Sequence, residues 1–159
     1  LTTILCTHGH YDHVGSAAAL KAEWNATLYC EKADLAGDRM YPLSAADCGY
    51  TEGEQIAVDE LHFTAWHTPG HTPGHVALYE PDSKSLFTGD TLFRESIGRT
   101  DLPGGDYSWI MRSILDVLVP LGDEVHVYPG HGPESTIGHE VLYNPFIVEV
   151  LNEEVNYKG

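Results

Sequence analysis

The sequence has few cysteines, few cations and no long apolar segment, and each shortage removes a class of protein. Its three cysteines are odd in number and form no Cys-x-x-Cys pair, so we expect no disulfide framework and a cytoplasmic location. No apolar run is long enough to cross a bilayer, so we expect no membrane partner. Only eight lysines and arginines stand against 24 acidic residues.

The resulting net charge of −16 argues against a nucleic-acid partner, because phosphates are bound by lysine and arginine. Bound cations would cancel part of this charge locally. A hydrophobic content of 42% in 159 residues is ordinary for one globular domain with its own core. We therefore predict a single domain, residues 1–159, that acts on a small-molecule substrate. The oligomeric state is left open, and a homodimer is compatible with these features.

The chemistry is concentrated in the stretch 7–15, which reads THGHYDHVG. It places His8, His10, Asp12 and His13 within six residues, and these side chains are ligands for zinc-like divalent ions. In an extended segment His8, His10 and Asp12 share one side, whereas His13 points elsewhere. The spacing therefore predicts two adjacent ions, each completed by residues from further along the chain. The plainer alternative is a polar loop whose histidines cap neighbouring backbone.

The rest of the sequence predicts the alternating strands and helices of an α/β fold. Strands are expected at 1–6, 27–30, 56–58, 61–67, 76–79, 85–87 and 125–128. Helices are expected at 15–24, 31–37 and 106–121, before a final helical region interrupted at 144–146. Loops are expected at 39–53 and 94–105, with a tight Pro/Gly double turn at 67–75.

The histidine-rich stretch resembles the signature of the metallo-β-lactamase superfamily. Four downstream motifs resemble its glyoxalase II-like hydrolase branch: HTPGHTPGH, TGDTLF, IGRTDLPGGD and YPGHGPESTIGHE. The resemblance covers nearly the whole chain and implies a four-layer αββα sandwich. It also implies that strands of the first sheet precede Leu1, so we expect an N-terminal segment to be missing from this sequence.

The resemblance also implies the metal ligands. The first ion would be held by His8, His10 and His71, and the second by Asp12, His13 and His131, with Asp90 as the bridge. Zinc is the expected metal, with iron and manganese as alternatives. His67 and His75 flank His71, but proline prevents a helix from placing all three together. We expect these two to hydrogen-bond or pack beside the site.

The implied activity is hydrolysis of a thioester, similar to that of hydroxyacylglutathione hydrolases. Two cations that share a water lower its pKa, so that a metal-bound hydroxide can attack near neutral pH. Asp12 and Asp90 are the expected catalytic carboxylates, with Asp12 orienting the attacking group. Glyoxalase II itself has a C-terminal helical domain with basic residues that hold glutathione. This chain resembles the short, single-domain members instead, which leaves the thiol carrier open.

Two other functions fit the same residues. An iron-dependent persulfide dioxygenase of this fold would use His8, His71 and Asp90 as a two-histidine, one-carboxylate set. A non-catalytic metal-binding scaffold is the third interpretation. Measuring the bound metal and the oxygen uptake of the protein would distinguish the hydrolase from these alternatives.

Two arginines follow Asp90 closely, at Arg94 and Arg99, in a chain with few cations. We predict that they bind an anionic group of the substrate. The alternative is that each forms a salt bridge within its own loop, to Glu95 or Asp101.

Overall fold

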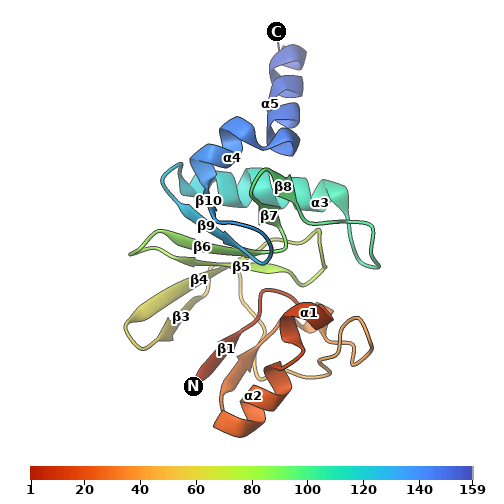
Figure 1. Cartoon of the computed structure of the whole chain (residues 1–159), viewed down its shortest axis with the longest axis vertical. Helices are drawn as coiled ribbons and strands as arrows, with labels where there is room; N and C mark the ends of the chain where they lie inside the picture. Colours follow the sequence, from red (N-terminus) through yellow and green to blue (C-terminus); the bar gives the residue numbers. More distant parts are fainter. Residues whose placement is uncertain (159) are drawn as a thin grey trace.

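The chain folds into four layers in the order helix, sheet, sheet, helix (Figure 1) in a computed structural model that describes the backbone of residues 1–158 and the side chains of 1–154. The larger sheet has the strand order β10-β9-β6-β5-β4-β3. Its strands are β3 (Gln55–Val58), β4 (Leu61–His67), β5 (Val76–Glu80), β6 (Ser85–Gly89), β9 (His126–Pro129) and β10 (Ser135–Thr136). Neighbouring strands are antiparallel except β6 and β9, which are parallel.

The smaller sheet consists of β1 (Thr3–Leu5) and β2 (Thr27–Tyr29), which run parallel. The helices α1 (Tyr11–Val14) and α2 (Ala17–Trp24) connect them and form the outer layer on this side. Within the described residues, β1 pairs with β2 alone. The existence of further strands before Leu1 remains a prediction.

The opposite outer layer begins with α3 (Tyr107–Arg112), which continues as a π-helical segment (Ser113–Leu118) and a 3-10 turn (Val119–Leu121). As predicted, Asp106 caps this helix, and its carboxylate accepts the Trp109 N–H at 2.9 Å. The layer also contains α4 (Ile137–Tyr143), α5 (Pro145–Lys158) and the hairpin of β7 (Leu92–Phe93) and β8 (Ser96–Ile97). The predicted break before α5 is present. None of the described helices combines the length and apolar character that a membrane span requires.

Each interface between layers has its own cluster of buried side chains. Strand β5 shows how alternation builds two of them, since successive side chains point to opposite faces of a sheet. Ala77 packs with the α3 layer, whereas Val76 and Leu78 face the smaller sheet and contact the cluster that includes Leu5. The third cluster lies between the smaller sheet and its helices and contains the free cysteines Cys6 and Cys30. All three interfaces between layers are therefore packed. The strand ends at one edge of the two sheets are held in place by packing on both faces of each sheet.

Four local predictions need correction. The expected helix at 31–37 is only a 3-10 turn (Lys32–Asp34), because the Asp34 side chain accepts hydrogen bonds from other segments. The expected helix at 15–24 begins at Ala17, after the separate turn of α1. The expected loop at 94–105 contains β8. In the helix expected at 106–121, the regular α-helix covers only Tyr107–Arg112, and the remainder is the π-helical segment and the 3-10 turn that contains Pro120.

Candidate metal centre

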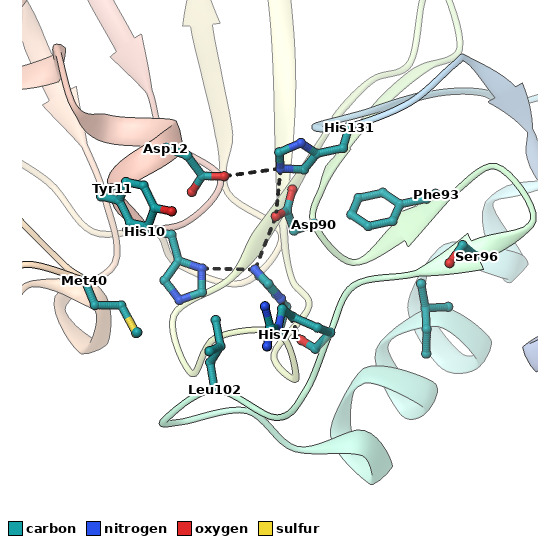
Figure 2. A pocket seen from close by; sticks show the side chains of 12 residues that line it. His10, Tyr11, Asp12, Met40, His71, Asp90, Phe93, Ser96, Leu102 and His131 are labelled. Atoms are coloured by element: carbon teal, nitrogen blue, oxygen red, sulfur yellow. Dashed lines mark hydrogen bonds and ion pairs between the residues drawn. The ribbon is translucent and has the colours of Figure 1, made fainter.

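The seven candidate ligands come from five segments that meet at one edge of the two sheets. The loop after β1 carries His8 and His10, and α1 carries Asp12 and His13. The double turn between β4 and β5 carries His71. The remaining two, Asp90 and His131, follow directly on β6 and β9. Figure 2 shows five of these side chains converging on one space.

The first set consists of His8, His10 and His71, which are all buried and whose ligand atoms lie within 4.8 Å of one another. The Nδ1 atom of His10 is 3.0 Å from Nε2 of His71. The buried Nε2 atom of His8 has no hydrogen-bond partner. Burial, reinforced by the neighbouring histidine His75, holds the pKa of His8 well below its usual value. This imidazole is therefore neutral, and its lone pair is available to a cation.

The second set consists of Asp12, His13, Asp90 and His131, whose ligand atoms also lie within 4.8 Å of one another. The Nε2 atoms of His13 and His131 are 3.2 Å apart. The Oδ2 atom of Asp12 lies 3.3 Å from Nε2 of His131. Unlike the first set, this group includes two exposed side chains, Asp12 and His131. Its open side leaves room for water or substrate, as catalytic metal sites require.

Asp90 lies between the two sets. Its Oδ2 atom is 3.3 Å from Nε2 of both His71 and His131, and its Oδ1 atom is 3.2 Å from Nε2 of His13. Burial would raise the pKa of Asp90, but the surrounding histidines, His13 and His71 foremost, outweigh it and hold the pKa far below its usual range. A carboxylate that is ionised at neutral pH and lies between two groups of histidine nitrogens provides the kind of donors that a pair of divalent ions needs. The residues present therefore fit two metal ions.

Backbone and side-chain partners fix the orientation of these ligands. The Nδ1–H of His71 donates to the Arg99 carbonyl at 2.7 Å, which leaves Nε2 unprotonated and facing the site. Gly98 passes so close to Asp90 that a Cβ atom there would lie 1.7 Å from the Asp90 carbonyl oxygen. Neither contact could be read from the sequence, because both depend on the loop returning to the strand end.

His75 supports Asp90 through a hydrogen bond to its backbone. From the sequence, His75 was expected only to hydrogen-bond or pack beside the site. It is fully buried, and its Nε2 atom accepts the backbone N–H of Asp90 at 3.0 Å. Its Nδ1–H therefore faces the Thr68 hydroxyl, 2.8 Å away. Burial lowers the pKa of His75 to about 3, so the ring is neutral. In contrast, His67 lies outside the cluster, where Nδ1 is 3.3 Å from Glu52.

The site opens into a cavity of about 360 Å³. Most of its non-ligand wall is apolar and comes from Tyr11, Met40, Phe93, Leu102 and Ile97. The first four of these side chains are labelled in Figure 2. This wall offers an apolar surface to a ligand that reaches the metals. The wall residues Phe93, Ile97 and Leu102 lie in the stretch after Asp90 that we expect to line the mouth of the site. Tyr11 and Met40 were not named from the sequence, because they come from other segments and share no pattern with that stretch.

The two arginines have different surroundings. Arg99 lines the cavity, but its Nε and Nη2 atoms donate to the two carboxylate oxygens of Asp101 at 2.7 and 2.9 Å. This is the salt bridge that the sequence left open as the alternative to substrate binding. Arg94 donates from Nη1 to the Glu134 carbonyl at 3.1 Å and is absent from the cavity lining. The contact of either arginine with substrate remains a prediction.

The fold and this cluster agree with the comparisons to known proteins. The profile of the metallo-beta-lactamase superfamily matches residues 1–131. The chain belongs to the metallo-beta-lactamase superfamily, and family and cluster together support a metal-dependent hydrolase. It is 39% identical over 161 residues to the hydroxyacylglutathione hydrolase GloC of Haemophilus influenzae, over 92% of this chain and 76% of that protein.

Two solved structures resemble this fold closely. The B3 metallo-beta-lactamase BLEG-1 superposes with a TM-score of 0.84 and 36% identity, covering 92% of this chain and 77% of that one. The di-iron-bound form of TTHA1623 superposes with a TM-score of 0.78 and 39% identity, covering 91% and 76%. These similarities support a binuclear site in this family but leave the metal open, since one relative binds iron.

Proposed function

We propose that this protein hydrolyses a small thioester in the cytoplasm, with two divalent metal ions held by the seven candidate ligands. The observation that carries the proposal is the pair of ligand sets that share Asp90 and open into one cavity. The similarity to a hydroxyacylglutathione hydrolase supports a thioester rather than another acyl compound. Zinc is the proposed metal, with iron and manganese as alternatives.

When bound, the two ions supply the positive charge that lowers the pKa of a water molecule and polarises the carbonyl of the substrate. Asp12 carries an exposed carboxylate on the cavity wall, beside His131. This carboxylate orients the attacking water and accepts its proton. Asp90, fixed through its N–H by His75, keeps the two sets of histidines at a constant separation.

The reaction forms a bond between the acyl carbon and the water oxygen and breaks the carbon–sulfur bond. The proton received by Asp12 is returned to the departing thiolate, so the products are a carboxylic acid and a thiol. A thiol with a pKa of about 8.5 is a good leaving group, and little further assistance is needed. The apolar wall that includes Met40, Phe93 and Leu102 holds the non-reacting part of the substrate.

Iron-dependent oxidation of a persulfide is the second candidate. His8, His71 and Asp90 converge in the structure, and Asp90 Oδ2 lies 3.8 and 3.3 Å from the Nε2 atoms of the two histidines. The di-iron-bound relative shows that a chain 39% identical to this one holds iron. In that case a subset of the same ligands would hold one iron ion.

The test combines elemental analysis with a substrate panel. The purified protein is assayed for zinc, iron and manganese, and then offered acyl thioesters, a β-lactam and a persulfide, with thiol release and oxygen uptake measured in parallel. We expect two ions per chain and thiol release from a thioester without oxygen uptake. Oxygen uptake with the persulfide, without thiol release from any thioester, would favour the dioxygenase. Turnover of the lactam and of no other compound in the panel would favour a lactamase. Asp116→Ala, an exposed change on the far helix, serves as the control variant.

A further inference from the structure

A buried carboxylate outside the ligand set connects the two segments that form the first set. Asp34 lies in the 3-10 turn after β2 and is fully buried. A buried carboxylate is costly unless hydrogen bonds satisfy its oxygens. Asp34 is not one of the candidate ligands, and from the sequence it is expected only to belong to the helix at 31–37. Its burial therefore needs a different explanation.

Asp34 accepts three hydrogen bonds, and two of the three donors belong to residues directly beside candidate ligands. Its Oδ2 atom accepts the Gly9 N–H at 2.9 Å and the Thr72 hydroxyl at 2.7 Å. Its Oδ1 atom accepts the Gly74 N–H at 2.8 Å. Gly9 lies between His8 and His10, and Thr72 directly follows the third histidine of the set. One carboxylate thus joins the loop with two ligands to the turn with the third.

The contacts are close enough to fix the separation of the two segments. A Cβ atom at Gly9 would lie 2.4 Å from the Asp34 carbonyl oxygen, and one at Gly74 would lie 2.7 Å from Asp34 Oδ1. Both glycines are therefore required for the backbones to approach the carboxylate. A second link, from the Val76 N–H to the Thr7 carbonyl at 2.7 Å, joins the same segments outside the ligand positions. The two segments are therefore joined by a main-chain hydrogen bond away from the ligands and by the Asp34 carboxylate beside them.

We propose that Asp34 is a positioning residue for the first ion, because it sets the distance between His71 and the pair His8 and His10. The inference rests on the proposed function only in taking these histidines as metal ligands. It does not depend on which substrate is hydrolysed. Loss of the carboxylate therefore weakens metal binding at the three-histidine set, beyond any effect on the stability of the metal-free protein.

The chain offers a matched control in Glu140. This residue is also buried, and its Oε1 atom accepts the Glu95 N–H at 2.7 Å and an Asn144 Nδ2–H at 2.9 Å, while Oε2 accepts the Ser135 hydroxyl. None of these donors is adjacent to a candidate ligand. Glu140→Gln and Asp34→Asn both replace a buried carboxylate by an amide of the same size. Each amide places an NH₂ group where the protein presents hydrogen-bond donors.

The experiment measures zinc affinity by competition with a chelator, together with the unfolding temperature of the metal-free protein. It is performed on the full chain. Each measurement is then repeated with His131→Ala added, which removes a ligand of the second set. We expect Asp34→Asn to weaken zinc binding about 10- to 100-fold, as loss of a hydrogen bond that supports ligands typically does. Glu140→Gln should lower the unfolding temperature without changing the zinc affinity. Equal zinc affinity in Asp34→Asn and the parent protein would overturn the inference, as would equal losses in Asp34→Asn and Glu140→Gln.

A milder pair of variants covers the case in which Asp34→Asn does not fold. Thr72→Val removes one donor to Asp34 and nearly keeps the side-chain shape, while Thr72→Ser keeps the hydroxyl. We expect weaker zinc binding in the valine variant and recovery in the serine variant. Identical affinities in the two would overturn the inference. If the parent protein binds two ions but hydrolyses no thioester, the proposed function fails while the role of Asp34 remains testable by the same titration.

Discussion

The two candidate ligand sets differ in how they meet solvent. The first set is buried, with side-chain exposures of 0% for His8 and 4% for His71. In the second set, His131 is 53% exposed and Asp12 is 39% exposed. The first set also has more supports, since the Arg99 carbonyl and the Asp34 carboxylate hold its segments. Within the described residues, the polar side-chain contacts of Asp12 and His131 are with other members of the second set.

This difference indicates a division of roles. The buried set is preorganised by the fold, because its ligands are fixed before any ion arrives. The exposed set faces the cavity, where an ion can exchange and a substrate can enter. Among the seven candidate ligands, Asp90 connects the two sets. Its side chain is 8% exposed and contacts histidines of each set. The comparison leads to three predictions, in order of decreasing effect.

The largest effect is expected from Asp90→Ala, which removes the group that the two sets share. We expect loss of at least one ion per chain and a decrease in thioester hydrolysis of at least about 10²- to 10³-fold, the typical cost of losing one preorganised electrostatic group. Metal content is measured by elemental analysis and turnover by thiol release. Asp12→Ala is the matched variant and should retain the ion of the buried set. Two ions and near-normal turnover in Asp90→Ala would show that the sets are independent.

An intermediate effect is expected from graded removal of metal. Because the second set is more exposed and has fewer supports, it should release its ion to a chelator first. The protein should therefore pass through a state with one ion per chain, in which His131→Ala changes the remaining affinity little and His8→Ala abolishes it. The measurement is bound metal as a function of chelator concentration. Simultaneous loss of both ions would contradict the division between the sets.

The smallest effect is expected from Arg99→Ala, at the cavity mouth. We predict a rise in KM of about 10-fold or less for a thioester with a carboxylate, with little change in kcat or metal content, since shared ground-state binding is removed. Asp101→Asn is the matched control, because it breaks the observed salt bridge but leaves the arginine free to bind the substrate. Equal losses in both variants, on charged and uncharged thioesters alike, would mean that Arg99 only braces its loop.

The sequence predicted the fold class and most elements because their signals are local. Alternating side chains in 61–67 and the cap at Asp106 were sufficient to place β4 and α3. The 3-10 turn at Lys32–Asp34 was predicted as a longer helix, because helical spacing gave no sign that Asp34 bonds to distant segments. The hairpin of β7 and β8 was missed because strands of two residues carry too short a pattern.

The candidate ligands could be named from sequence because histidines and aspartates in dense motifs are unusual and chemically specific. All seven of those residues lie together in the structure, in two groups that differ in burial. Their metal-binding role remains a prediction. Of the supports, His75 could be named, but Asp34 and the Arg99 carbonyl could not, since a buried aspartate and a main-chain carbonyl have no distinctive sequence signal. Arg99 illustrates the limit, because both substrate binding and a salt bridge with Asp101 were compatible with its position in the sequence, and the structure contains the salt bridge.

The sequence by itself determined the chemistry that is available: histidine and carboxylate ligands, few cations, and the segments that become strands and helices. The tertiary structure decided which ligands are buried, which carboxylate is shared, and that Asp34 joins two of the ligand segments. The physical reason is distance along the chain. Propensity and periodicity act over a few residues, whereas Gly9 and Gly74 meet the same carboxylate only after two sheets have packed face to face.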